Sequence, residues 1–302
     1  TTSANSGATV DGELPKNVGT YYVKAEIPAT DNYNSTTATG SFKIIPRPAK
    51  LKWSASEFIY DGEEKSVSAT VENALQGDTF NLVYENAKGR NAQEYVAKVI
   101  NLGNSNYSLE EDGKPVETIS HSWKITKADI KSTSVKMDDW TYGFYDERKN
   151  GPSVDANPGN GNVSYTYYTD ADCKSPTTLA NSGAAKDGEL PKNVGTYYVK
   201  AEIPATDNFN STTATGSFKI IPRPVKLKWS ASEFIYNGEE KNVYATVENA
   251  LQGDTFNLVY ENAKGRNAQE YVAKVTGLGN SNYSLEEDGK PVETISHSWK
   301  IT

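Results

Sequence analysis

The side chains that could do chemistry in this 302-residue chain are few and widely separated. His121 and His297 are the only histidines, and Cys173 is the only cysteine. Nucleophilic catalysis needs a base beside its nucleophile, and a zinc site needs three or four grouped ligands. No motif brings such groups together, so we expect no catalytic residue, no metal site and no cofactor.

Acidic side chains are more plentiful, and they fall in short groups at Asp138-Asp139, Asp146-Glu147 and Glu286-Glu287-Asp288. Carboxylate oxygens suit calcium, but none of these groups has the spacing of a calcium-binding loop. Paired carboxylates for glycoside hydrolysis would have to flank one groove, which nothing in the sequence suggests. We therefore expect these groups to form solvated turns.

The histidines and the cysteine have structural interpretations. Strand alternation places His121 on one face with Trp123 and Ile125, so we expect it at the margin of a core, and His297 occupies the same place in a second copy. Cys173 lies in a loop next to Lys174, a weak sign of a reactive thiol. An inert loop thiol is the preferred interpretation.

The best binding candidates are the tyrosines Tyr168, Tyr198 and Tyr22. Alternation along 163–168 and 195–201 directs Tyr168 and Tyr198 away from the core, and Tyr22 is the copy of Tyr198. Exposed aromatic rings offer a large contact area at a small entropy cost. The alternative is that they cover sheet edges or pack where two modules join.

These residues belong to a repeated chain, in which residues 1–126 return as 177–302. The copies differ at Ser3/Leu179, Thr9/Ala185, Val10/Lys186, Tyr33/Phe209, Ala49/Val225, Asp61/Asn237, Ser66/Asn242, Ser68/Tyr244, Ile100/Thr276 and Asn101/Gly277. An active site needs to be built once, whereas reach and avidity grow with copy number. The repetition therefore favours a non-enzymatic protein.

A weaker internal repeat divides the chain further. Each unit ends with a strand of the form Ser-[Phe/Trp]-Lys-Ile. This predicts four segments: a half module at 1–45, the first B module at 46–126, module A at 127–221 and the second B module at 222–302. The half module matches only the back half of module A, and its inward residues Tyr21, Val23 and Ala25 need a facing sheet. We expect it to be unstable alone, and to pair with a neighbouring molecule or with a front half missing from this chain.

Composition limits the classes of partner. The net charge of -8 and a pI near 5.0 argue against nucleic acid, because phosphate binding needs clustered Lys and Arg. A single cysteine permits no intramolecular disulfide. No apolar run has the length of a membrane helix, so we expect no membrane insertion in this segment.

Alternating residues predict an all-β fold of tandem immunoglobulin-like β-sandwich modules in an elongated array. Period-two patterns occur at 163–168, 195–201, 256–260 and 271–275. Tyr60-Asp61-Gly62 and its copy Tyr236-Asn237-Gly238 predict type I′ hairpins. Glu287-Asp288-Gly289-Lys290 predicts a further hairpin, between 282–285 and 294–301. Pro222-Arg223-Pro224 predicts a short, stiff joint.

Several of these motifs resemble the MBG and YDG-type repeats of bacterial surface proteins, notably of gut Firmicutes. The resemblance rests on Tyr142-Gly143, Tyr60-Asp61-Gly62, the Gly-x-Tyr-x-Val-x-Ala strand, the following Asn-[Tyr/Phe] pair and the terminal Ser-x-Lys-Ile strand, although Asn237 departs from the pattern. It covers nearly the whole chain. It implies an extracellular, cell-wall-anchored adhesin of a Gram-positive bacterial surface, with a host protein or glycan as partner. The resemblance also implies immunoglobulin as one host protein that such an adhesin could bind. Stalk, specific capture of a host protein, and enzyme remain three alternatives, the enzyme being the least favoured.

Overall fold

The computed structural model describes residues 6–8 and 12–302 and shows an all-β chain with very little helix. It divides into two compact units. One comprises the chain up to Ala128 with Asp207–Phe209, and the other comprises Asp129–Thr206 with Asn210–Thr302. No helix in the described part of the chain is long and apolar enough to cross a membrane.

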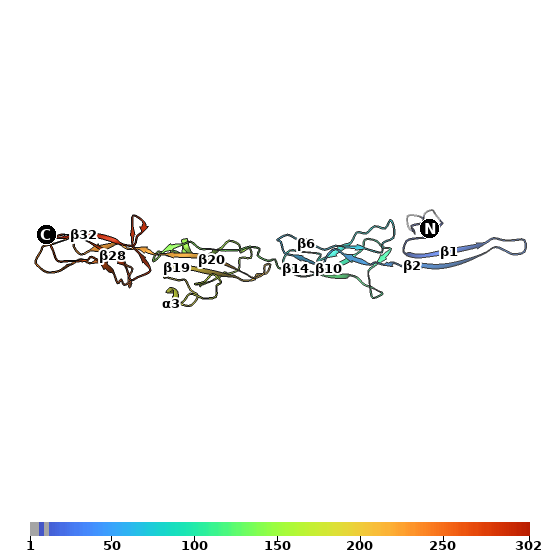
Figure 1. The fold of residues 1–302 in the computed structure, drawn as a ribbon. Coiled ribbons are helices and arrows are strands. Elements are labelled where there is room, and N and C mark those ends of the chain that lie inside the picture. The colour runs from blue at the N-terminus through green and yellow to red at the C-terminus, as the bar shows by residue number, and fades with distance from the viewer. Residues whose placement is uncertain (1–5, 9–11) are drawn as a thin grey trace. The chain divides into compact units, whose positions relative to one another are not determined.

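Module A is built on a four-stranded sheet in the order β16-β20-β19-β18. Its elements are β15 (Val135–Lys136), β16 (Trp140–Thr141), α2 (Glu147–Asn150), β17 (Ser153–Val154), β18 (Ser164–Tyr168), α3 (Leu179–Ser182), β19 (Gly195–Ile203) and β20 (Thr212–Ile221). The long strands β19 and β20 run antiparallel side by side, as Figure 1 shows. β16 joins β20 in parallel, and β15 pairs with β17.

The core of module A follows from the alternation of β19, since Tyr197, Val199 and Ala201 are all buried, as predicted. Phe218 of β20 lies at the centre, with its ring stacked on that of Trp140 at a centroid distance of 5.0 Å. Gly216 lets β15 approach closely, because a Cβ there would lie 2.3 Å from the Val135 carbonyl oxygen. Burial of large aromatic side chains supplies most of the stabilisation of a small β module.

The two B modules share one arrangement, a four-stranded sheet with paired short strands packed against it. The first contains β3 (Arg47–Pro48), β4 (Leu51–Trp53), β5 (Glu57–Ile59), β6 (Lys65–Ser66), β7 (Ala69–Val71), β8 (Val83–Glu85), β9 (Lys88–Gly89), β10 (Gln93–Asn101), β11 (Tyr107–Ser108), β12 (Glu110–Glu111), β13 (Lys114–Pro115) and β14 (Ile119–Thr126). The sheet order is β5-β14-β10-β8, and the pairs are β4-β7, β6-β9, β3-β11 and β12-β13.

The second B module repeats this order as β23-β32-β28-β26, with the pairs β22-β25, β24-β27, β21-β29 and β30-β31. Its strands are β21 (Arg223–Pro224), β22 (Leu227–Trp229), β23 (Glu233–Phe234), β24 (Lys241–Asn242), β25 (Ala245–Val247), β26 (Val259–Glu261), β27 (Lys264–Gly265), β28 (Glu270–Gly277), β29 (Tyr283–Ser284), β30 (Glu286–Glu287), β31 (Lys290–Pro291) and β32 (Ile295–Ile301). Trp299 is 2% exposed and stacks on Tyr271 at 4.5 Å, so β28 and β32 share a buried aromatic pair.

The half module is a two-stranded hairpin of β1 (Gly19–Ile27) and β2 (Thr36–Ile44). Its register equals that of β19 and β20, yet none of the described residues forms a further strand beside it (Figure 1). Val23 is 54% exposed, whereas its copy Val199 is fully buried. In the described part of the chain, the apolar face of β1 and β2 is therefore partly exposed, whereas the equivalent face of module A is buried.

Two local predictions are wrong. Only Gly62 and Gly238 have positive φ at the Asp-Gly and Asn-Gly pairs, so these turns are not type I′, which needs two such residues. The Asp61 side chain instead accepts a hydrogen bond from the Glu63 N–H at 3.0 Å, and the flanking strands β5 and β6 pair elsewhere. Asp288-Gly289 does have two positive φ values and forms a hairpin, but its strands are β30 and β31. They are not the expected segments 282–285 and 294–301, because β29 pairs with β21 and β32 pairs with β28 and β23.

The predicted strand over 256–260 is shorter in the structure, where β26 begins at Val259. Phe256 and Leu258 still pack against the core cluster that contains Val275. The alternation of these residues therefore predicts their burial correctly. The residues 256–258 are not part of a strand, because the Asn257 N–H donates to the Leu278 carbonyl in a loop.

Module A and the second B module belong to one unit and meet through specific contacts. The hydroxyls of Tyr142 and Tyr283 donate to the two carboxylate oxygens of Asp254, at 3.1 and 2.7 Å. The Val194 N–H donates to the Asn282 side chain at 2.8 Å. The joint predicted at Pro222-Arg223-Pro224 is thus held by side chains on both modules.

We expect the second unit to lose stability in alkali. Burial raises the pKa of Tyr197 and Tyr167 above the value near 10 that a tyrosine has in the unfolded chain. The contribution of these two tyrosines to the free energy of unfolding is therefore complete below pH 10. It is lost as the pH rises further, because the tyrosines ionise first in the unfolded chain. Melting temperatures measured from pH 8 to pH 12 should fall above about pH 10. A constant value up to pH 12 would contradict this.

Candidate functional site

The structure brings two of the three candidate tyrosines together. Tyr168 on β18 and Tyr198 on β19 are directly opposite each other in the antiparallel register. Their neighbours Tyr167 and Val199 form the adjacent pair and are buried in the core, so alternation places the tyrosine pair on the opposite face. Both rings are half-buried. Directly opposed residues are neighbours on one face of a sheet, so both rings belong to the same surface.

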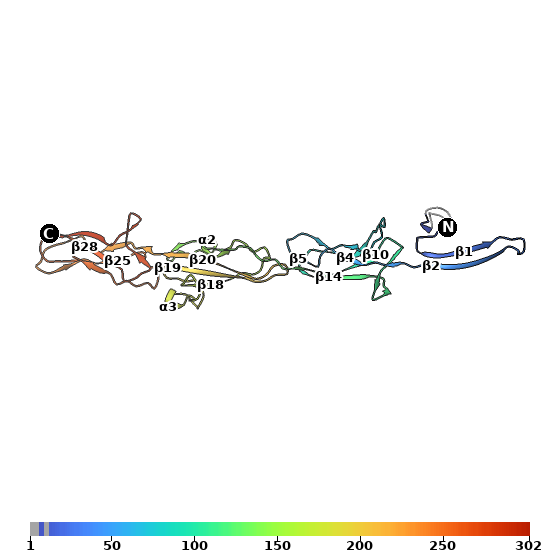
Figure 2. The same ribbon diagram turned by 45° about the vertical axis from the view of Figure 1, so that its right-hand side comes forward.

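Polar residues surround this tyrosine pair. Thr166 lies opposite Lys200, and Ser217 lies opposite Tyr198 on β20. Lys200 forms an ion pair with Glu202 at 3.3 Å. Because β18 is the outer strand of its sheet, the pair lies near a sheet edge. There the segment 175–177 bonds to β18, and α3 lies nearby (Figure 2). An aromatic centre with a polar rim suits a protein surface more than a small-molecule pocket.

Tyr22, the third candidate, lies apart from this pair. It is 81% exposed on β1 and is paired with Ser41 of β2. Among the described residues no strand corresponding to β18 lies beside its hairpin, so none of them takes the place of Tyr168. The three candidates therefore supply one paired site and one isolated ring.

Cys173 has surroundings that disfavour the thiolate. Burial and the negative charge of Asp170 raise the pKa of its thiol, and the Lys200 charge opposes them only in part. The Asp170 carboxylate also fixes the loop, accepting hydrogen bonds from the N–H groups of Lys174 and Ser175. A reactive cysteine needs a lowered pKa.

The histidines lie where the alternation predicted. The His121 ring stacks on Trp53 at a centroid distance of 4.6 Å, and its Nε2 lies 2.8 Å from the carbonyl oxygen of Ala55. A carbonyl only accepts, so Nε2 carries the proton. That nitrogen therefore cannot take a proton from Ser56, whose hydroxyl is 3.4 Å away. His297 repeats the stacking on Trp229 at 4.7 Å.

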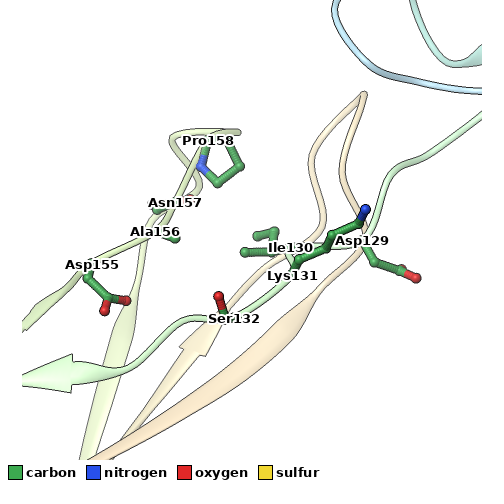
Figure 3. Close-up of a pocket in the computed structure, with 8 residues that line it drawn as sticks. All are labelled: Asp129, Ile130, Lys131, Ser132, Asp155, Ala156, Asn157 and Pro158. Atoms are coloured by element: carbon green, nitrogen blue, oxygen red, sulfur yellow. The ribbon is translucent and has the colours of Figure 1, made fainter.

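An open hollow of about 560 Å³ lies between two loops of module A, 129–132 and 155–158, and Figure 3 shows its lining residues. The carboxylate of Asp155 accepts hydrogen bonds from the N–H and hydroxyl of Ser134, which lower its pKa. Asp129 accepts from the Asn210 side chain at 2.7 Å. Both carboxylates thus hold loops in place, and no group of three potential metal ligands occurs among the described residues.

Comparison with known proteins adds no assignment, because the chain matches no protein-family model and no curated protein. The tyrosine pair is therefore judged on its geometry. Tyr244 was not among the candidate residues predicted from the sequence, and it lies over another hollow, in the second B module. The change from Ser68 to Tyr244 between the copies was the signal that marked it.

Proposed function

We propose that this chain is a non-enzymatic repeat region of a bacterial cell-surface adhesin, a stalk and multivalent binding surface made of tandem immunoglobulin-like modules. The near-exact repetition of 1–126 as 177–302 carries the proposal. Duplicated modules add length and further binding sites, and linked sites hold a multivalent partner far more tightly than one site does. The packed contact of module A with the second B module supports a stiff connection within the stalk.

A second function, capture of a host protein such as immunoglobulin, is favoured by the pairing of Tyr168 with Tyr198. Tyrosine pairs are common anchors of protein interfaces, since each ring buries much area and keeps a polar end. The face belongs to module A, which this chain contains once as a complete module. Capture would then use this face, while the B modules act as spacers.

The test compares the full chain with its Tyr168→Ala and Tyr198→Ala variants on immobilised immunoglobulin and mucin. Capture predicts that each substitution weakens binding by about thirtyfold, the loss typical of a central interface residue. Tyr22→Ala is the matched control, because it changes an equivalent tyrosine that lacks the opposite ring, and it should bind like the unmodified chain.

Two outcomes separate the proposals. Equal binding by all variants would exclude the tyrosine face as the capture site. Absence of binding by the unmodified chain to either protein would exclude capture and leave the stalk. Unchanged melting temperatures of the variants would confirm that the substitutions act on binding and not on folding.

A further inference from the structure

The two B modules have nearly identical sequences, yet their differences concentrate in one place. They differ at Ala49/Val225, Asp61/Asn237, Ser66/Asn242, Ser68/Tyr244, Ile100/Thr276 and Asn101/Gly277. Three of these pairs fall within the short stretch 237–244 of the second module. The second module therefore carries a locally changed surface on an otherwise unchanged scaffold.

Two of the side chains that differ from the first B module point outward. Val243 is 1% exposed, and its N–H donates to the Ala263 carbonyl at 2.9 Å. Since side chains alternate along an extended segment, Asn242 and Tyr244 point away from the core that Val243 enters. Both are exposed, Tyr244 to 55%. The Tyr244 N–H donates to the Ser230 hydroxyl at 3.1 Å, which fixes the backbone that carries the ring.

These side chains border a shallow hollow of about 360 Å³. It is lined by Asn242, Val243, Tyr244, Tyr260, Asn262, Ala263 and Lys264. Val243 and Ala263 are buried beneath it, and the amides of Asn242 and Asn262 stand at its rim without a hydrogen-bond partner among the described residues. Lys264 is directed to Glu240, at 3.6 Å.

We propose that this hollow binds one neutral sugar ring of a glycan. One face of a hexose is lined by C–H groups, and an exposed tyrosine ring such as that of Tyr244 offers a flat apolar surface for it. The sugar hydroxyls both donate and accept hydrogen bonds, and so does a side-chain amide. Asn242 and Asn262 thus match the hydroxyls that surround a sugar stacked on Tyr244.

The lining also argues against other ligands. An anion would need a free cation, but the only cation in the lining, Lys264, faces the carboxylate of Glu240. A metal ion would need carboxylate oxygens, and the lining contains none. A stable protein contact buries about 800 Å² on each partner, far more than one tyrosine and two amides present. A sugar ring fits both the size and the polarity.

The test uses the full chain with lactose and diacetylchitobiose as probes, and saturation-transfer NMR as the readout. We expect saturable binding with a Kd on the order of 1 mM, as a single shallow site provides. Tyr244→Ser should weaken it at least about tenfold. Serine is the residue that the first B module carries at this position, so this variant has a natural precedent for folding.

A gain of function completes the design. Introducing Ser66→Asn together with Ser68→Tyr into the first B module should create a second site and double the sugar bound per chain. The proposal is overturned if neither sugar binds the unmodified chain, if Tyr244→Ser binds equally well, or if sialyllactose binds much more tightly than lactose. Because Tyr244 lies outside module A, these results do not depend on the tyrosine face of the proposed function.

Discussion

Replacing Phe218 with alanine is expected to destabilise module A by about 3–5 kcal/mol, the usual cost of removing a buried phenylalanine ring. Its ring is 2% exposed and contacts three aromatic rings, at centroid distances of 5.0 Å to Trp140, 5.8 Å to Tyr197 and 5.9 Å to Tyr167. Alanine would leave a cavity among rigid rings that cannot close over it.

The chain contains its own control for this substitution. Phe42 is the copy of Phe218 in the half module, with the same neighbours along the strand, but it is 39% exposed. Among the described residues its one aromatic ring contact is with Tyr21, at a centroid distance of 5.7 Å. Phe42→Ala should therefore cost only about 1–2 kcal/mol, because its ring is less buried and leaves no enclosed cavity. Thermal denaturation of both variants measures the difference. Equal costs would show that β1 and β2 are covered in solution.

Amide hydrogens of β1 and β2 are expected to exchange at least about a thousandfold faster than those of β19 and β20, although the two hairpins have almost the same sequence. Exchange of a strand amide needs opening of the strand, and packing sets the free energy of that opening. Val199 and Ala201 are fully buried, whereas Val23 is 54% exposed. A two-stranded hairpin without a covering layer is marginally stable in water.

Mass spectrometry can follow the two hairpins separately with peptides that span Tyr33 or Phe209, because this is the one position at which the hairpins differ. The measurement should be made at two protein concentrations at least tenfold apart. Protection of β1 and β2 that rises with concentration would show that a neighbouring molecule covers the face. Strong protection at both concentrations would contradict the expected instability of the half module.

The sequence was enough to predict an all-β chain, because buried and exposed residues alternate along a β-strand with a period of two. Tyr197, Val199 and Ala201 were predicted to face a core and are buried. His121 was placed at a core margin by the same rule and stacks on Trp53. These predictions succeed because alternation is a property of the strand itself and needs no knowledge of its partner.

Turn geometry and strand pairing could not be predicted from the sequence. Asp61-Gly62 has the composition of a type I′ hairpin, but β5 pairs with β14 and β6 pairs with β9, so no hairpin forms there. The partner of a strand depends on contacts between residues far apart in the chain, where local propensity carries no information.

The candidate sites were likewise predictable from the sequence only in part. Alternation placed Tyr168 and Tyr198 on outward faces, but only the register of β18 against β19 made them partners. The sequence recorded the change from Ser68 to Tyr244 without showing what lies beside it. The tertiary structure supplied the hollow, because Asn242 and Asn262 come from separate segments that meet when β24 pairs with β27. The sequence gives the residue types directly. A site, however, depends on which side chains lie close together, and the packing of the strands determines that.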